Sequence, residues 1–265
     1  MRAHLREPLT VSDIAEKARL GPFPFSRLFR DETRLSPGRY LTALRIHEAK
    51  RLIGDSSMST AEVAAAVGYR TPESFTDAFT AATGLPPGAF RRLCRGLAQE
   101  PPAPGPGPGP QRGALAGTVR LPAGLGNARV YLGAFATPLV QYPAAAAAVV
   151  DVPADRPSCY TLHDVPAGTW HLLAVAVAAA GAHGPQAATT PLVGDRATPV
   201  TVTADTVTSA ALRLRPARPA DPPVLLALPA LTPPHTVVPQ PGCPAGAPPP
   251  AARPRAVTAP PPSGA

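Results

Sequence analysis

The hydrophobic positions of the first hundred residues follow a helical period, and the same pattern occurs twice. Apolar residues separated by three or four positions predict amphipathic helices in two segments that lie about fifty residues apart. The first copy reads Ile14, Ala15, Ala18, Leu20, Phe25, Leu28, Phe29 and Leu35, and the second reads Val63, Ala64, Val67, Tyr69, Phe75, Ala78, Phe79 and Leu85. One short helical unit is therefore present twice.

Side chains that start helices stand in front of both copies. Thr10 with Asp13, and Ser59 with Glu62, have the spacing of a capping box, in which a hydroxyl and a carboxylate each accept a hydrogen bond from a free backbone N–H group. The first helix of each unit is therefore expected to begin at these residues.

Two prolines predict where the second helix of each unit begins. Pro22 and Pro72 follow a turn, and a helix tolerates proline at its first position because the missing N–H group has no partner there. We expect second helices over 22–32 and 72–82, with one long helix over 37–53 between the units. A short helix, a tight turn and a second helix form the helix-turn-helix arrangement, whose second helix enters the major groove of DNA.

Residues about 1–95 resemble the DNA-binding domain of the AraC/XylS family of transcriptional regulators. The resemblance is carried by LTVSDIAEKARLGPFPFSRLFRDETRLSPGRYLTALRIHEAKRLI and STAEVAAAVGYRTPESFTDAFTAATGLPPGAFRR, including the closing SPG and PPG turns. It implies a seven-helix domain that places two recognition helices in successive major-groove segments. The residues ahead of the PLT segment supply only the last turn or two of the family's first helix. The DNA-reading positions implied by the resemblance are Phe23, Ser26, Arg27, Arg30, Pro72, Glu73, Ser74, Thr76 and Asp77.

The chemistry of these side chains differs between the two units. Arg27 can form a bidentate pair with guanine, and Phe23 offers an apolar surface to a thymine methyl group. In the second unit, Asp77 stands where the family commonly has a basic residue, and Glu73 adds another carboxylate. A carboxylate accepts from cytosine N4 but repels phosphate, so the second unit is expected to bind more weakly or to read a different base.

The overall charge agrees with a nucleic-acid partner. The chain of 265 residues has a formal net charge of +8 and a pI of about 10.1. Arginine greatly outnumbers lysine, which a GC-rich genome also explains. No apolar run approaches the length of a membrane span, and no signal peptide is evident, so a cytoplasmic, nucleoid-associated location is expected. The three widely spaced cysteines are expected to be reduced.

The pattern changes after a stretch rich in proline and glycine. Residues 99–112 contain PPAPGPGPGP, which we interpret as a linker that lets its flanking domains move independently. Residues 113–216 then alternate with a two-residue period, which predicts an all-β antiparallel sandwich. The predicted domains are thus an all-α double helix-turn-helix domain (1–98), the linker, the sandwich and a disordered tail rich in proline and alanine (217–265).

The predicted sandwich resembles the carboxypeptidase regulatory-like, transthyretin-like modules, chiefly through YTLHDVPAGTWHLLAVAV. One relative of these modules is an enzyme, the hydroxyisourate hydrolase, which ends with a tyrosine-arginine-glycine-serine motif. That motif is absent from this sequence, so the resemblance does not predict catalysis. A metal site would need His163 and His171 to lie side by side, whereas outward-facing sheet positions are the simpler interpretation. Trp170 is interpreted as a packing residue rather than part of a ligand pocket.

Two functions follow from these patterns. The first is a sequence-specific DNA-binding transcriptional regulator, with double-stranded promoter DNA as its partner, RNA polymerase as a further candidate, and an unknown small-molecule or protein ligand for the β domain. The second is a protein-interaction module built on a degenerate AraC-like domain with weak, non-specific DNA binding. No catalytic residues, metal site, cofactor or membrane contact is predicted, so an enzyme is not expected.

Overall fold

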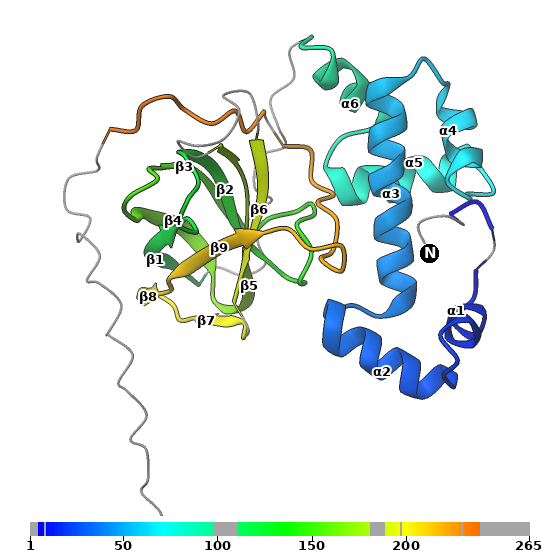
Figure 1. Ribbon diagram of the computed structural model, residues 1–265, viewed down its shortest axis with the longest axis horizontal. Coiled ribbons are helices and arrows are strands. Elements are labelled where there is room, and N and C mark those ends of the chain that lie inside the picture. Colours follow the sequence, from blue (N-terminus) through cyan, green and yellow to red (C-terminus); the bar gives the residue numbers. More distant parts are fainter. Residues whose placement is uncertain are drawn as a thin grey trace, which may run out of the picture.

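The computed structural model describes residues 5–7, 9–97, 111–180, 189–196, 198–228 and 230–238. Helices make up the first described part of the chain and strands the second, and the two parts lie side by side (Figure 1). They are called the helical domain and the β domain below. Most of the predicted linker, residues 99–110 of 99–112, lies outside the described residues.

The helical domain follows the predicted order closely. Both capping boxes are present, with the Thr10 hydroxyl accepting from the Asp13 backbone N–H (3.2 Å) and the Ser59 hydroxyl from that of Glu62 (3.2 Å). The backbone N–H bonds of the capping boxes lower the pKa of both carboxyl groups. The helices are α1 (Val11–Lys17), α2 (Pro22–Thr33), α3 (Pro37–Asp55), α4 (Thr60–Ala66), α5 (Pro72–Thr83) and α6 (Pro87–Cys94).

The sequence repeat produces the same aromatic packing in both units. In the first, the ring of Phe29 lies 5.5 Å from that of Phe25 and 5.2 Å from that of Tyr40. In the second, the ring of Phe79 lies 5.5 Å from each of Phe75 and Phe90. These contacts hold α2 against the start of α3, and α5 against α6, by the same chain of three rings.

The resemblance implied seven helices, but the described residues contain six. Residues 5–7 form a turn rather than a helix, and α1 begins after it. The guanidinium of Arg45 donates to the carbonyl oxygens of Leu5 (3.1 Å) and Glu7 (3.0 Å), so this turn is fixed by side-chain bonds to α3.

The tight turns of the two units contain a matched pair of left-handed residues. Arg19 has φ 55° after α1, and Gly68 has φ 83° after α4. A side chain is disfavoured in this region, so we expect Arg19→Gly to raise the free energy of unfolding by about 0.5–1 kcal/mol in urea titrations.

Gly68→Ala provides the opposite control. A Cβ atom at Gly68 would meet the carbonyl oxygen of Leu5 at 2.5 Å, so this variant should be less stable than the wild type. A loss of stability in Arg19→Gly would show that the Arg19 side chain contributes more than its backbone strain costs.

The β domain is a single nine-stranded sheet in the order β3-β2-β5-β6-β9-β1-β4, with β7 paired to β5 and β8 to β1. The prediction of an antiparallel sandwich is therefore wrong in two respects. The sheet is nearly closed, since its end strands β3 and β4 meet where the Ser158 hydroxyl donates to Asp151 O (2.9 Å). In addition, β1 pairs in parallel with β8 and β9. The strands are β1 (Arg112–Arg120), β2 (Ala128–Phe135), β3 (Ala146–Val152), β4 (Ser158–Pro166), β5 (Gly168–Ala179), β6 (Thr189–Asp195), β7 (Val200–Val202), β8 (Val207–Ser209) and β9 (Leu212–Pro216).

The predicted disordered tail is wrong for its first part. Leu225, Leu226 and Ala227 are buried, and they lie between the two domains. The interpretation missed the apolar run at 224–228 because the surrounding prolines and alanines dominate the composition. The domains also share one hydrophobic core through Leu139, so the expectation that they move independently is wrong for this structure.

Lys50 of α3 lies at this junction. Its ammonium group donates to the carbonyl oxygens of Val224 (3.2 Å) and Leu226 (2.9 Å) and lies 5.6 Å from the centre of the Phe90 ring. Burial lowers the pKa of Lys50 to about 8, while nearby Cys94 acts in the opposite direction.

This lowered pKa predicts a stability change at alkaline pH. The ordinary pKa of lysine, 10.5, lies above the pKa of Lys50 in the folded chain, so between about pH 8 and 10.5 the unfolded chain binds more protons than the folded one. The free energy of unfolding should therefore rise with pH over this window. Urea titrations of the wild type and Lys50→Met between pH 7.5 and 10 test this. Equal pH dependence in both proteins would contradict it.

Candidate nucleic-acid interface

The N-terminal half of α2 presents an exposed face. Phe25 and Phe29 occupy the inner side of this helix, so the residues between them point outward. Phe23 is 90 % exposed, which is exceptional for an aromatic side chain, and Arg27 is also exposed. The structure brings the sequence-predicted residues of the first unit together along a shallow groove lined by Phe23, Pro24, Ser26, Arg27, Leu28, Arg30 and Asp31.

The cations on this face are available to a partner. Within the described residues, no hydrogen bond or ion pair holds the guanidinium groups of Arg27 and Arg30. Each guanidinium group presents five N–H donors in a planar fork that suits guanine or phosphate. Ser26 is half-buried beside them, so α2 offers an aromatic, a hydroxyl and two cationic groups over its first turns.

The outward face of α5 is acidic. Glu73 and Asp77 are exposed and four residues apart, which places both carboxylates on one side of the helix. The Thr76 hydroxyl donates to Pro72 O (2.8 Å), and the Ser74 hydroxyl donates to Thr71 O (3.0 Å). The hydroxyl groups predicted to read bases thus already bond to their own helix, and the two carboxylates dominate this face.

The long helix α3 separates the two exposed faces. Figure 1 shows α2 at the start of α3, with α4, α5 and α6 around its later part. A helix of 19 residues is about 28 Å long. That length suits a spacer between neighbouring turns of one DNA groove, which repeat every ~34–36 Å.

The β domain contacts the C-terminal ends of α2 and α5 rather than their first turns. Arg34, which follows α2, donates from Nη1 to Arg196 O (2.7 Å). At the end of α5, Ala82 O accepts from the backbone N–H of Tyr142 (2.9 Å). Helix-turn-helix proteins contact bases with the N-terminal residues of the recognition helix. The N-terminal end of α2 lies beside α1, at the end of the helix away from the β domain (Figure 1).

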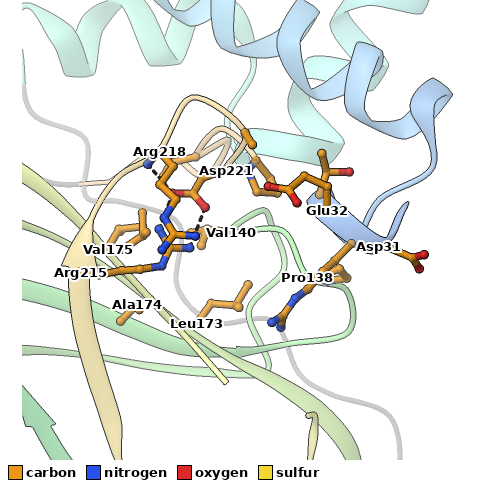
Figure 2. Close-up of a pocket in the computed structure, with 17 residues that line it drawn as sticks. Asp31, Glu32, Pro138, Val140, Leu173, Ala174, Val175, Arg215, Arg218 and Asp221 are labelled. Atoms are coloured by element: carbon orange, nitrogen blue, oxygen red, sulfur yellow. Dashed lines mark hydrogen bonds and ion pairs between the residues drawn. The ribbon is translucent and has the colours of Figure 1, made fainter. Parts of the chain in front are cut away.

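A cleft of about 300 Å³ lies between the end of α2 and the β domain (Figure 2). Leu173 and Val175 form part of its apolar lining, and Asp31 lines the opposite side. Arg215 pairs with Asp221 through two contacts of 2.7 Å. This arrangement lowers the pKa of Asp221 despite its partial burial. The charged groups on the β side of the cleft thus already neutralise one another in part.

The other candidate sites are resolved by the sheet topology. His163 lies on β4 and His171 on β5, and these strands do not pair, so the two imidazoles are not brought side by side. Trp170 packs against the β core and donates to Pro166 O (2.7 Å), which fits a packing role. Among the described residues, no cluster of His, Cys, Asp and Glu could hold a metal ion.

The cysteine expectation needs one correction. Cys94 is free, but Cys159 is disulfide-bonded, so the expectation that all three cysteines are reduced is wrong for Cys159. Spacing along the chain carries little information about distance in the fold, and Cys243 lies outside the described residues. None of the helices in the described part of the chain has both the length and the apolar character needed to cross a membrane.

Comparison with known proteins agrees with the geometry of the helical part. Residues 14–93 match a family described as a helix-turn-helix domain. This domain is 36 % identical over 91 residues to the uncharacterized HTH-type transcriptional regulator YobQ of Bacillus subtilis, an alignment that covers 34 % of this chain and 38 % of that protein. It is 34 % identical over 89 residues to the RCS-specific HTH-type transcriptional activator RclR of Escherichia coli, covering 34 % of this chain and 31 % of that protein.

The similarity covers only part of each protein. The chain spans less than two-fifths of the length of these curated relatives. Among solved structures, the DNA-binding domain of AdpA in complex with a target DNA is similar to the helix-turn-helix domain, with 33 % identity and a TM-score of 0.35. That alignment covers 36 % of this chain and 86 % of AdpA's chain.

Proposed function

We propose that this protein is a sequence-specific DNA-binding transcriptional regulator of the AraC/XylS type. The observation that carries the proposal is the exposed face of α2, where Phe23, Arg27 and Arg30 lie outside the contact with the β domain and no described residue pairs with either guanidinium group. A burial-driven fold has no reason to leave an aromatic ring 90 % exposed beside two cations. The relatives named as transcriptional regulators support the same function.

The two units divide the work of reading DNA. Arg27 is the principal base reader, through N7 and O6 of a guanine, and Phe23 packs on a thymine methyl group. Arg30 and Ser26 contact the phosphate backbone or a neighbouring base. In the second unit, Glu73 or Asp77 accepts from cytosine N4, so α5 contributes selectivity with less affinity.

The remaining DNA-reading positions assigned to α5 are more limited. Pro72 offers apolar surface at the helix start, and Ser74 and Thr76 contribute only when their hydroxyls leave the bonds to the helix backbone. Two reading helices on one chain allow a monomer to bind an asymmetric site. Contact with RNA polymerase, and a ligand for the β domain, stay predictions of the same proposal.

A titration with two DNA duplexes tests the proposal. Fluorescence anisotropy would compare the DNA upstream of the protein's own gene with a scrambled duplex of equal length, at 50 and 200 mM salt. Preference for the native duplex that persists at the higher salt supports a specific regulator, because non-specific binding rests on phosphate contacts. Equal binding to both duplexes, abolished by salt, would favour the protein-interaction module instead.

A further inference from the structure

The two recognition helices meet the β domain at corresponding positions. Thr33 and Thr83 are equivalent residues of the repeat, fifty positions apart, and each ends its helix. Immediately after α2, Arg34 bonds to Arg196 O of the β domain. At the end of α5, Thr83 O accepts from the backbone N–H of Ala227 (3.0 Å). The β domain and the segment after it therefore contact both helices at the end remote from the base-reading turns.

The segment 224–228 packs into both domains by strict alternation. Leu225 and Ala227 belong to the hydrophobic core of the helical domain. Val224, Leu226 and Leu228 pack instead in a cluster of the β domain that includes Phe135. An extended chain points successive side chains to opposite sides, so this short run fastens the two domains together along its whole length.

Two polar side chains of α3 anchor the backbone of the same segment. Lys50 donates to Val224 O and Leu226 O. Nearer the start of α3, the Tyr40 hydroxyl lies within bonding distance of Pro219 O (3.3 Å) and Asp221 O (3.4 Å). Buried carbonyl groups require such partners. The segment 219–228 thus runs along α3, the helix that sets the distance between α2 and α5.

We propose that the β domain is a brace for the recognition helices, clamped to α3 by residues 219–228, so that α2 and α5 are held at a fixed separation. Lys50 is a positioning residue in this brace, because it acts on DNA recognition through the segment it holds. The inference rests on the proposed function for its DNA consequence, whereas the clamp itself is independent of DNA.

Rigid separation has a defined effect on DNA selection. Two reading heads fixed at one distance fit half-sites at one spacing and are misaligned by a single inserted base pair. Reading heads joined by α3 alone, without the β domain, would tolerate more spacings but would lose conformational entropy on binding. The brace is therefore expected to raise the affinity for half-sites at the correct spacing and to lower the affinity for half-sites at other spacings.

Hydrogen exchange of the full chain tests the clamp without DNA. The Leu225 and Ala227 amides bond to Val140 O (2.9 Å) and Thr83 O (3.0 Å), so peptides covering 224–228 should exchange slowly. Lys50→Glu places a carboxylate against two carbonyl oxygens and should speed this exchange at least tenfold. The matched control is Arg51→Glu, the same charge change one residue further on α3, where the side chain is exposed and pairs with Glu48 and Asp55 at the surface.

A milder variant keeps the test decisive if Lys50→Glu does not fold. Tyr40→Phe retains the ring that packs on Phe29 but removes the hydroxyl, and it should speed exchange two- to threefold over 219–228. Exchange of the wild-type segment at the rate of an unstructured peptide, or equal exchange in Lys50→Glu and Arg51→Glu, overturns the brace.

A DNA-binding experiment distinguishes failure of the brace from failure of the proposed function. Duplexes selected from a random pool by the wild-type protein would be lengthened by one base pair between the two contacted half-sites. The wild type and Arg51→Glu should lose at least tenfold in affinity, and Lys50→Glu less than threefold. Equal losses overturn the link between brace and spacing. Failure to select any sequence contradicts the proposed function while the exchange result still decides the clamp.

Discussion

Replacing Arg27 with alanine is expected to lower the affinity for the specific DNA site about 5- to 150-fold, equivalent to the ~1–3 kcal/mol of a bidentate arginine–guanine pair. The side chain is exposed near the start of α2 and no described residue pairs with it, so the change removes a DNA contact without disturbing packing. The preference for guanine at one position should be lost together with affinity. Anisotropy titrations against the selected site and its single-base variants measure both.

Arg51→Ala is the matched control for this experiment. Arg51 is an exposed arginine on α3 whose ion pairs with Glu48 and Asp55 lie at the surface, where such pairs contribute little stability. Arg51→Ala removes one positive charge but no predicted DNA contact, so its affinity for the specific site should differ from that of the wild type by less than twofold. If Arg27→Ala binds as well as the wild type and keeps its base preference, the assignment of α2 as the reading helix is wrong.

The second large effect is expected at Asp77, where the substitution by arginine should strengthen DNA binding. The change replaces a charge that repels phosphate with one that attracts it, on an exposed face of α5. Each added phosphate contact steepens the dependence of log affinity on log salt by about 0.9. We expect Asp77→Arg to raise affinity about tenfold at low salt, with the salt slope steeper by about 1 and selectivity for cytosine reduced.

Two further variants separate the causes. Asp77→Asn removes the repulsion without adding a phosphate contact, so affinity should rise modestly while the salt slope changes little. Asp55→Arg makes the same charge change at the exposed end of α3, on a different helix from the predicted reading positions, and should have a much smaller effect. An unchanged salt slope in Asp77→Arg would place α5 away from the phosphate backbone.

Much of the helical domain could be predicted from the sequence because its signals are local. Capping boxes, proline at the first helical position and a period of three to four apolar residues act over a few residues, so α1 to α5 begin where the pattern predicts. The repeat added information that neither copy contains alone, since Phe25 and Phe75 confirm each other as inner positions of equivalent helices.

The sequence predicted where the candidate site lies, but not how its side chains are bonded or how far they are exposed. Spacing and resemblance indicated which residues face outward on α2 and α5, and the structure brings them to exposed first turns. Only the structure shows that the Ser74 and Thr76 hydroxyls bond to their own helix. The 90 % exposure of Phe23 is likewise visible only in the structure. Whether these residues read DNA stays a prediction.

The β domain was predicted less well because sheets depend on pairing between distant residues. The alternating pattern over 113–216 predicted strands in general, whereas β3 (Ala146–Val152) is an alanine-rich run that carries little strand propensity of its own. Periodicity also cannot distinguish a sandwich from a nearly closed sheet with parallel pairs, because both bury alternate residues.

By itself, the sequence determined the two helix-turn-helix units, their spacing and the identities of their outward-facing residues, because helix signals are local and the repeat doubles them. Only the tertiary structure decided what happens to the segment after β9. Its Val-Leu-Leu-Ala-Leu run lies among prolines and has no helical or sheet partner nearby in the chain. It becomes ordered because α3 and the β domain together supply two apolar surfaces and the donors of Lys50 and Tyr40, which are brought together only by folding.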